Sequence, residues 1–336
     1  MIKIALLGLG NVARAFVDYL NKISADHNPP VQIVALADST GGIQISSSDQ
    51  VDRAVALKQS GASIANVSPA DVIRDAREFI ARLPETGAHF LVESLPTNLS
   101  SGQPALELLE AALARGIHVV TVDKGPLVHG MDALKKAAVA AGSHLGFSGT
   151  TGVGIPEEIH SERVLEIRGV LNGTTNYILS EMQERGFSFD QALARAQADG
   201  IAEPDPALDI EGWDTAVKIL ILAKDLMGAT ARIDEVSRIG IDSKIELLIE
   251  TARERACRVR LVGRARIWQG RVRVSVAPKI VAADSPFYSV SGTSKAAVFR
   301  VEEKGNLLAF AKSGRDVISQ IILDDILKIA GQVGRE

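Results

Sequence analysis

The feature that most constrains the fold is a glycine turn between a strand-like and a helix-like segment at the start of the chain. Gly8-Leu9-Gly10-Asn11-Val12-Ala13 follows the apolar, β-rich Ile2–Leu7 and opens an amphipathic stretch. In this G-x-G-x-x-A pattern the first glycine permits a tight turn, and the second lets the backbone approach a pyrophosphate. The helix N-terminus then presents free N–H groups and its positive dipole end. The pattern predicts a dinucleotide site; a tight turn without a ligand is the alternative.

The first half of the chain alternates between strand-like and helix-like segments. Strands are expected at Ile2–Leu7, Val31–Ala37, His89–Glu93 and His118–Thr121, and helices at about 11–22, Ala105–Arg115 and Met131–Ala141. Such alternation is typical of a parallel, doubly wound α/β sheet with right-handed crossovers. We therefore expect a Rossmann-type dinucleotide-binding domain over residues 1–145. A C-terminal segment from about 309 to 336, including a helix at Val317–Ala330, is expected to complete it.

The pattern changes after Gly142. Leu145–Pro156 is rich in Gly, Ser and Thr and is expected to form a strand and loops. Helices are expected at Thr174–Arg185, Ser188–Asp199 and Asp214–Met227, and antiparallel strands at Arg258–Val262, Arg271–Ala277, Ala297–Val301 and Leu307–Ala311. The last two strands flank a hairpin turn at 303–306. A second α/β domain is therefore expected over residues 146–308.

Composition narrows the class of protein. A chain of 336 residues with 46% hydrophobic and 23% charged residues is expected to form two globular domains. Cys257 is the single cysteine, which excludes a disulfide framework and a cysteine-based zinc site. A net charge of −4 and 4% aromatic residues argue against a nucleic-acid partner. Lysines interrupt the apolar runs and no signal peptide is evident, so we expect no membrane partner and a cytoplasmic enzyme.

Asp38 ends the second predicted strand, where a carboxylate can accept hydrogen bonds from the adenosine ribose hydroxyls and repel a 2′-phosphate. This placement favours NAD over NADP. Lys58 could still reach a phosphate, and Asp38 could equally be a turn or cap residue. Both coenzymes therefore remain open.

Two lysines have the chemistry that alcohol oxidation requires, namely a base for the hydroxyl proton beside a hydride acceptor. Lys124 directly follows the strand at 118–121, at the edge where open α/β sheets bind ligands; a solvated turn lysine is the alternative. Asp214 and Lys218 are four residues apart and share one helix face, as a surface ion pair also would. To accept a proton Lys218 must be neutral for part of the cycle, which burial and a nearby Lys124 would both favour.

Several segments together resemble the homoserine dehydrogenase family. The most specific is Gly169-Val170-Leu171-Asn172-Gly173-Thr174-Thr175-Asn176-Tyr177-Ile178-Leu179, which is similar to the family signature I-L-N-G-T-T-N-Y-I-L. The similarity continues through the acidic loop around Glu203 to Lys218, and further matches lie at 96–105, 118–127, 276–278 and 290–292. The resemblance implies reversible oxidation of L-homoserine to L-aspartate 4-semialdehyde with NAD or NADP, a step towards threonine and methionine.

The resemblance also implies roles by position. Lys218 would be the proton donor or acceptor, with Lys124 assisting and Asp214 ordering the lysine network. The residues implied in substrate binding are Glu203, Asp214, Asn172 and Thr174. Those implied at the cofactor are Gly8, Leu9, Gly10, Asn11, Val12, Asp38, Ser39, Leu95, Pro96, Lys124, Gly200 and Gly314. Family members are usually dimers formed through the second domain, so a homodimer without a regulatory ACT domain is expected.

The sequence departs from the family pattern at several positions. Ser148 takes the place of a glutamate that often ligates a monovalent cation, so a cation would rest on backbone carbonyls, and we assign no metal ligand. Lys312–Gln320 replaces a glycine-rich segment, of which Gly314 survives. A dehydrogenase of another small amino alcohol or semialdehyde is therefore one alternative. A cofactor-binding sensor without turnover is another, although a sensor has no need of Lys124, Glu203, Asp214 and Lys218.

Overall fold

A computed structural model describes residues 1–23, 31–68, 72–312 and 314–333. The chain divides into two compact units, one formed by Met1–Thr150 with Gly314–Glu336 and the other by Thr151–Ser313. Ser313, in the segment that departs from the family pattern, and the last three residues of the expected first domain lie outside the described residues.

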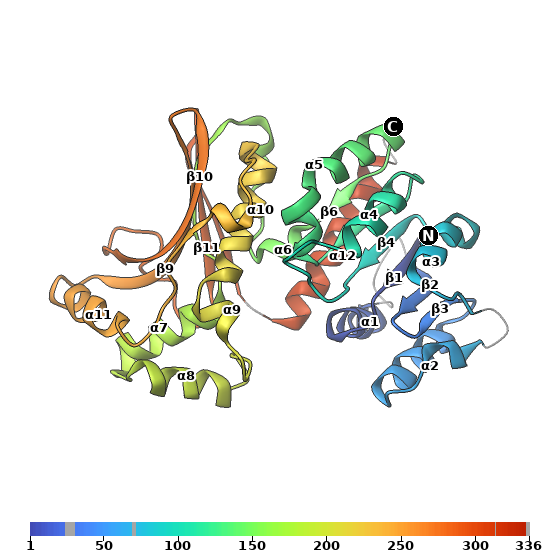
Figure 1. The fold of residues 1–336 in the computed structure, drawn as a ribbon, viewed down its shortest axis with the longest axis horizontal. Helices are drawn as coiled ribbons and strands as arrows, with labels where there is room; N and C mark the ends of the chain where they lie inside the picture. Colours follow the sequence, from blue (N-terminus) through green and yellow to red (C-terminus); the bar gives the residue numbers. More distant parts are fainter. Residues whose placement is uncertain (24–30, 69–71, 313, 334–336) are drawn as a thin grey trace. The chain divides into compact units, whose positions relative to one another are not determined.

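The first unit is built on a six-stranded sheet in the order β3-β2-β1-β4-β5-β6 (Figure 1). Its strands are β1 (Ile2–Leu7), β2 (Val31–Asp38), β3 (Gly41–Gln44), β4 (Phe90–Glu93), β5 (His118–Thr121) and β6 (Leu145–Gly146). All pair in parallel except β3, which forms an antiparallel edge with β2. The expected doubly wound parallel sheet is confirmed. The strand-like segments of the sequence do not predict β3, because this edge strand is short and half glycine.

Helices flank this sheet. They are α1 (Asn11–Ile23), α2 (Ser48–Gln59), α3 (Ala76–Thr86), α4 (Ala105–Leu113), α5 (Lys124–Ala141), α6 (Ser148–Thr151) and α12 (Arg315–Val333). The core packs Phe16 of α1 and Ile326 of α12 against Leu6 and Leu36 of the central strands. α5 begins seven residues before the expected start at Met131, because Asp123 caps it and the helix continues through a kink at Gly130.

The second unit is a mostly antiparallel six-stranded sheet in the order β12-β11-β7-β9-β10-β8. Its strands are β7 (Val164–Val170), β8 (Ser237–Arg238), β9 (Arg258–Trp268), β10 (Arg271–Val281), β11 (Lys295–Val301) and β12 (Gly305–Ala311). Its helices are α7 (Gly173–Arg185), α8 (Phe189–Ala198), α9 (Ala207–Ile210), α10 (Trp213–Met227) and α11 (Ile245–Glu254). The expected hairpin between β11 and β12 is confirmed.

The two faces of this second sheet differ. α10 covers one face so closely that a Cβ atom on Gly263 would lie 3.1 Å from side-chain atoms of Ile219 and Thr215. The opposite face is covered in part by the loop after β10, whose Phe287 and Val290 pack on the sheet. Cross-strand pairing places exposed apolar side chains on the remainder of that face, among them Phe310, which is 61% exposed.

No helix among the described residues combines the length and the apolar character that crossing a membrane requires.

Candidate functional site

In the first unit the glycine turn meets the end of β4 at the centre of the sheet. β1 pairs with β2 on one side and β4 on the other, so the chain order reverses here, and open α/β sheets bind ligands at this point. Gly8 has a φ of +95°, and a Cβ atom there would lie 2.7 Å from the carbonyl oxygen of Ser94. A Cβ atom on Gly10 would meet no atom within 4 Å, and the first turn of α1 contains no acidic residue. The turn is thus an open cradle of N–H groups suited to an anion.

Asp38 ends β2 and is held by two neighbours. Its Oδ1 accepts hydrogen bonds from the amide and hydroxyl of Thr40, each at 2.7 Å, and its Oδ2 lies 2.6 Å from Nζ of Lys58 on α2. Burial opposes ionisation of Asp38, but the bonds from Lys58 and Thr40 outweigh it and hold its pKa below the ordinary value. Asp38 thus makes the contacts of a turn residue, and its role at the ribose stays a prediction. Ser39 follows in the exposed turn.

The loop after β4 forms a second wall of this edge. Residues 95–100 with Gln103 and Pro104 line a hollow of about 590 Å³, which includes Leu95 and Pro96. The loop packs backbone to backbone on the start of α5, since a Cβ atom on Gly125 would lie 2.5 Å from the carbonyl oxygen of Asn98. Lys124 is the first residue of α5. It therefore stands at the carboxyl edge of the sheet, beside the loop that carries Leu95.

Two buried acids lie beneath this wall. Glu93 ends β4, and its carboxyl group lies 2.5 Å from Oγ1 of Thr121 and accepts a bond from the amide of Leu95 at 2.6 Å. Burial, followed by the charge of Asp123, raises the pKa of Glu93 to about 8. Burial also raises the pKa of Asp123, whose Oδ1 accepts from the amide of Gly125. Glu93 was absent from the predicted site, yet a carboxyl side chain ending a wholly buried strand was a usable signal.

In the second unit Lys218 belongs to a compact polar cluster. Its Nζ lies 2.5 Å from Oδ2 of Asp214, one turn earlier on α10, and donates to the carbonyl of Leu171 at 3.0 Å. The side chains of Lys218 and Asp214 are 12% and 15% exposed. The alternative of a solvated surface pair is therefore wrong. An ammonium has three N–H donors, and these contacts use two of them.

Asn172 joins the cluster from the start of α7. Its Oδ1 caps that helix by accepting from the amide of Thr175 at 2.8 Å. Its Nδ2 donates to Oδ2 of Asp214 at 2.8 Å and to Oδ1 of Asp209 at 2.6 Å. Asp209 was not among the predicted site residues, although it lies in the acidic loop before α10. Asp209 lies on α9 and Asp214 on α10, so no shared helix face links them, and the density of acids in this segment was the available signal.

The remaining predicted residues are distributed over both units. The hydroxyl of Thr174 donates to the carbonyl of Ile201 at 3.2 Å, beside Gly200, whose φ is +69°. Glu203 is exposed on this turn, and among the described residues no hydrogen bond or ion pair joins its carboxylate to the Lys218 cluster. Gly314 directly precedes α12 in the first unit.

Ser148 acts as a hydrogen-bond donor in the first unit. Its amide and hydroxyl donate to the two carboxylate oxygens of Asp325 on α12, at 2.9 and 2.7 Å. The next loop is also internally bonded, since the hydroxyl of Thr151 donates to the carbonyl of Val153 at 2.9 Å. No group of three or more metal-ligating acidic, histidine or cysteine side chains occurs in the described ranges.

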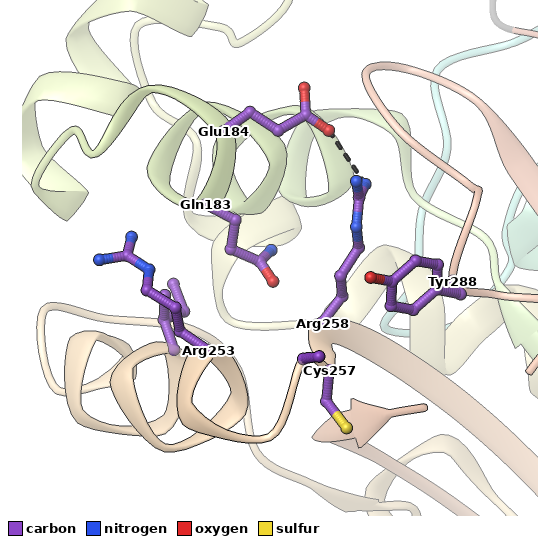
Figure 2. A pocket seen from close by; sticks show the side chains of 8 residues that line it. Gln183, Glu184, Arg253, Cys257, Arg258 and Tyr288 are labelled. Atoms are coloured by element: carbon purple, nitrogen blue, oxygen red, sulfur yellow. Dashed lines mark hydrogen bonds and ion pairs between the residues drawn. The ribbon is translucent and has the colours of Figure 1, made fainter. Parts of the chain in front are cut away.

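A small hollow of about 210 Å³ lies at the far end of α7 from Asn172 (Figure 2). Arg258 pairs with Glu184 at 3.0 Å on its rim, and Gln183 is bonded to the backbone of Val259. Since α7 rises about 1.5 Å per residue, the hollow lies about 17 Å along the helix from the cap. It contains none of the predicted site residues.

The Rossmann-type sheet with its glycine turn defines the class of dinucleotide-binding α/β proteins, and the buried lysine–carboxylate cluster of the second unit supplies a group able to carry a proton. The family model described as homoserine dehydrogenase matches residues 154–327. An NAD(+)-dependent homoserine dehydrogenase of Pseudomonas canavaninivorans is 32% identical over 97% of this chain and 96% of its own length. This chain belongs to the homoserine dehydrogenase family.

Solved structures agree with this placement. The chain matches the crystal structure of a putative homoserine dehydrogenase of Archaeoglobus fulgidus with a TM-score of 0.82 and 26% identity, over 98% of this chain and 99% of that one. It matches a hyperthermophilic archaeal homoserine dehydrogenase in complex with NADPH with a TM-score of 0.77 and 25% identity, over 98% of each chain.

Proposed function

We propose that this chain catalyses the reversible NAD(P)-dependent oxidation of L-homoserine to L-aspartate 4-semialdehyde. The observation that carries the proposal is the buried cluster of Lys218, Asp214 and Asn172 in a chain that also has a glycine cradle. A nicotinamide bound at the glycine turn would supply hydride transfer to and from the alcohol carbon. The chain itself must move the hydroxyl proton.

Lys218 is the proposed proton carrier. In the direction of reduction its third N–H would donate to the aldehyde oxygen, and in oxidation the neutral amine would take the hydroxyl proton. Asp214 and the carbonyl of Leu171 hold Nζ in place, so the proton is delivered along a fixed direction. Lys124, at the carboxyl edge of the sheet in the first unit, is proposed to assist this proton transfer.

Substrate recognition is proposed to use the acids and the α7 cap. Homoserine carries an ammonium group, which the carboxylates of Asp214 and Glu203 would bind. Asn172 would orient Asp214 through its hydrogen bond, and Thr174 would hold the backbone at Ile201. Asp209, which shares the amide of Asn172 with Asp214, adds a third carboxylate to Asp214 and Glu203. Glu203 is exposed, so it would engage the substrate from the 199–206 turn.

The coenzyme is proposed to bind along the carboxyl edge of the first sheet. The proposed contacts are Gly8, Leu9, Gly10, Asn11, Val12, Asp38, Ser39, Leu95, Pro96, Lys124, Gly200 and Gly314. The missing Cβ atom at Gly10 fits a pyrophosphate, because a side chain there would narrow its approach, whereas Gly8 lets the turn pack on the backbone of Ser94. NAD is the proposed preferred coenzyme, since Asp38 is held as a carboxylate where a 2′-phosphate would lie.

The test is homoserine-dependent reduction of NAD and NADP by the wild type and Lys218→Ala. We expect the variant to lose turnover by several orders of magnitude while coenzyme affinity, measured separately by nucleotide fluorescence, barely changes. Lys244→Ala is a matched control, because Lys244 is exposed at the start of α11 in the same unit. Equal rates for wild type and Lys218→Ala would exclude Lys218 as the proton carrier.

The altered segment 312–320 favours one alternative, a dehydrogenase of the same scaffold for another small amino alcohol or semialdehyde. Steady-state rates with homoserine and with chain-shortened or chain-lengthened amino alcohols distinguish the two. A monovalent cation is retained as a hypothesis on the carbonyls of 149–156. Its test is a titration with Na⁺ and K⁺ at constant ionic strength, where a flat response removes it.

A homodimer through the second unit is part of the proposal. The partly open face of its sheet supports this, because it carries exposed Leu308, Phe310 and Trp268 beside a groove of about 660 Å³. Sedimentation of the wild type and Phe310→Asp tests it, with dissociation expected for the variant. We also propose a cytoplasmic location, which suits a chain whose single cysteine is free.

A further inference from the structure

We propose that Glu93 is a positioning residue for the coenzyme, which joins the loop bearing Leu95 to the end of β5 and the start of α5. This inference rests on the proposed function, because it concerns the edge where the coenzyme would bind. Glu93 itself has no exposed surface, so it acts through the backbone that it holds rather than by touching a ligand.

Glu93 connects two parts of the coenzyme edge, namely the loop after β4 and the end of β5. One carboxyl oxygen accepts from the amide of Leu95 at 2.6 Å, which fixes the direction of the loop as it leaves β4. The other lies 2.5 Å from Oγ1 of Thr121, at the end of β5. Thr121 in turn accepts from the amide of Asp123, the cap of α5, at 3.0 Å. The chain of contacts therefore reaches from the Leu95 loop to the helix that begins at Lys124.

The groups that face Glu93 are the hydroxyl of Thr121 on β5, the amide of Leu95 and, from the cap of α5, the carboxylate of Asp123; on β1 its register partner is the apolar Leu7. No ion pair joins Glu93 to any residue that the structure describes. Full burial beside a like charge therefore favours the neutral acid. The rise of its pKa to about 8 agrees.

A neutral acid at position 93 can donate a hydrogen bond, which a carboxylate cannot. A carboxyl group can accept from Leu95 with one oxygen and donate its O–H to Thr121 with the other. Thr121 can then direct its own hydrogen to the carbonyl of Asp123, 3.4 Å away. A carboxylate can only accept hydrogen bonds. Ionisation of Glu93 would therefore turn the Thr121 hydroxyl towards Glu93, and its hydrogen bond to the carbonyl of Asp123 would be lost.

This link extends to the coenzyme edge. Leu95 lines the hollow of this edge, and Asn98 of the same loop packs its carbonyl on Gly125. A shift of the Leu95 amide would therefore move the loop relative to the start of α5. The expected consequence is weaker coenzyme binding with substrate contacts in the second unit unchanged.

The test combines direct binding with a spectroscopic readout. NADH fluorescence titrations from about pH 6 to about pH 9.5 compare the wild type with Glu93→Gln, Glu93→Ala and the control Glu110→Gln, an exposed glutamate on α4. We expect wild-type affinity to fall as pH rises through about 8. Glu93→Gln should keep the low-pH affinity within about threefold and abolish that fall, because an amide also donates and accepts. Glu93→Ala should weaken binding by about tenfold or more at every pH.

Difference infrared spectra provide the second measurement. The wild type at neutral pH should show the C=O band of an un-ionised carboxylic acid, which Glu93→Gln removes and Glu110→Gln leaves. Circular dichroism confirms that each variant is folded, and Thr121→Val tests the link if Glu93→Ala does not fold. Wild-type affinity in Glu93→Ala, or in its replacement Thr121→Val, or absence of the acid band, would overturn the inference. A folded wild type that binds no NADH at any pH would instead refute the proposed function, together with any positioning role at its coenzyme edge.

Discussion

The two units each bury acidic side chains, but they treat them in opposite ways. In the first unit Glu93 lies near Asp123 and forms no ion pair with the described residues, and burial raises the pKa of both acids. In the second unit Asp214 is bonded to the ammonium of Lys218 and to the amide of Asn172. A buried carboxyl group can therefore act in two ways. As a neutral acid it can fix a segment of backbone by hydrogen bonds, and as a carboxylate it can bind a cation.

Replacing one buried acid by its amide in each unit should give the largest difference between the two units. Asp214→Asn removes the charge that holds Lys218, whereas Glu93→Gln keeps a neutral side chain of the same shape. We expect Asp214→Asn to lower kcat by about 100-fold or more, and Glu93→Gln to lower it by less than about threefold near neutral pH. Steady-state kinetics of both variants provide the measurement. Similar losses in the two variants would show that the two acids do not differ in kind.

The pH dependence of stability sharpens the comparison for the first unit. Burial and the nearby charge of Asp123 raise the pKa of Glu93 from its ordinary 4.5 to about 8 in the folded protein, so the folded state holds the proton over this interval. Its contribution to stability is therefore complete below about 4.5 and is lost as pH rises through 8. Glu93→Gln should remove this loss, and it should become more stable than the wild type by an amount on the order of 1–3 kcal/mol near pH 8.

Denaturant unfolding at several pH values measures this effect, with Glu110→Gln as the control for charge. A wild type whose free energy of unfolding is level between pH 5 and pH 8 relative to Glu93→Gln would show that Glu93 is ionised in the folded protein. That result would make the two units alike in their buried acids.

The sequence predicted much of this comparison and missed a specific part of it. The glycine turn, the parallel sheet and the homoserine dehydrogenase resemblance follow from local patterns, because period and turn chemistry are written in neighbouring residues. Asp214 and Lys218 were recognised because two residues four positions apart on a helix share a face. Glu93 and Thr121 were missed because their pairing depends on which strands lie side by side, and the two residues are 28 positions apart in the sequence.

Asp38 shows a third treatment, an acid held charged by a lysine in the first unit. Lys58→Met removes this partner and leaves the carboxylate to repel a 2′-phosphate more strongly. We expect the ratio of NAD to NADP affinity to rise by about tenfold, while Asp38→Asn should lower it. Binding titrations with both coenzymes measure the ratio. An unchanged or lower ratio in Lys58→Met would show that Lys58 does not screen Asp38 from the phosphate.

The smallest expected effect lies at the opposite edge of the first sheet, where His118 and His144 are partly buried. His118 begins β5, and its Nδ1 accepts a bond from the amide of His144 at 3.1 Å. Burial, then the charges of His144 and His89, lower the pKa of His118 below 6.5. Since the folded state binds fewer protons, the stability that His118 contributes is present above 6.5 and is lost as pH falls through its folded pKa.

His118→Asn keeps an acceptor that cannot be protonated at these pH values, so it should flatten the loss of stability on acidification. Because His118 is only partly buried, we expect a difference of about 0.5 kcal/mol or less between pH 7 and pH 5. Hydrogen exchange of the β4–β6 amides measures it, with His129→Asn as the exposed control. If His118→Asn and the wild type lose the same stability between pH 7 and pH 5, His118 does not contribute to the pH dependence. Glu93 would then be the group of this comparison that makes stability depend on pH.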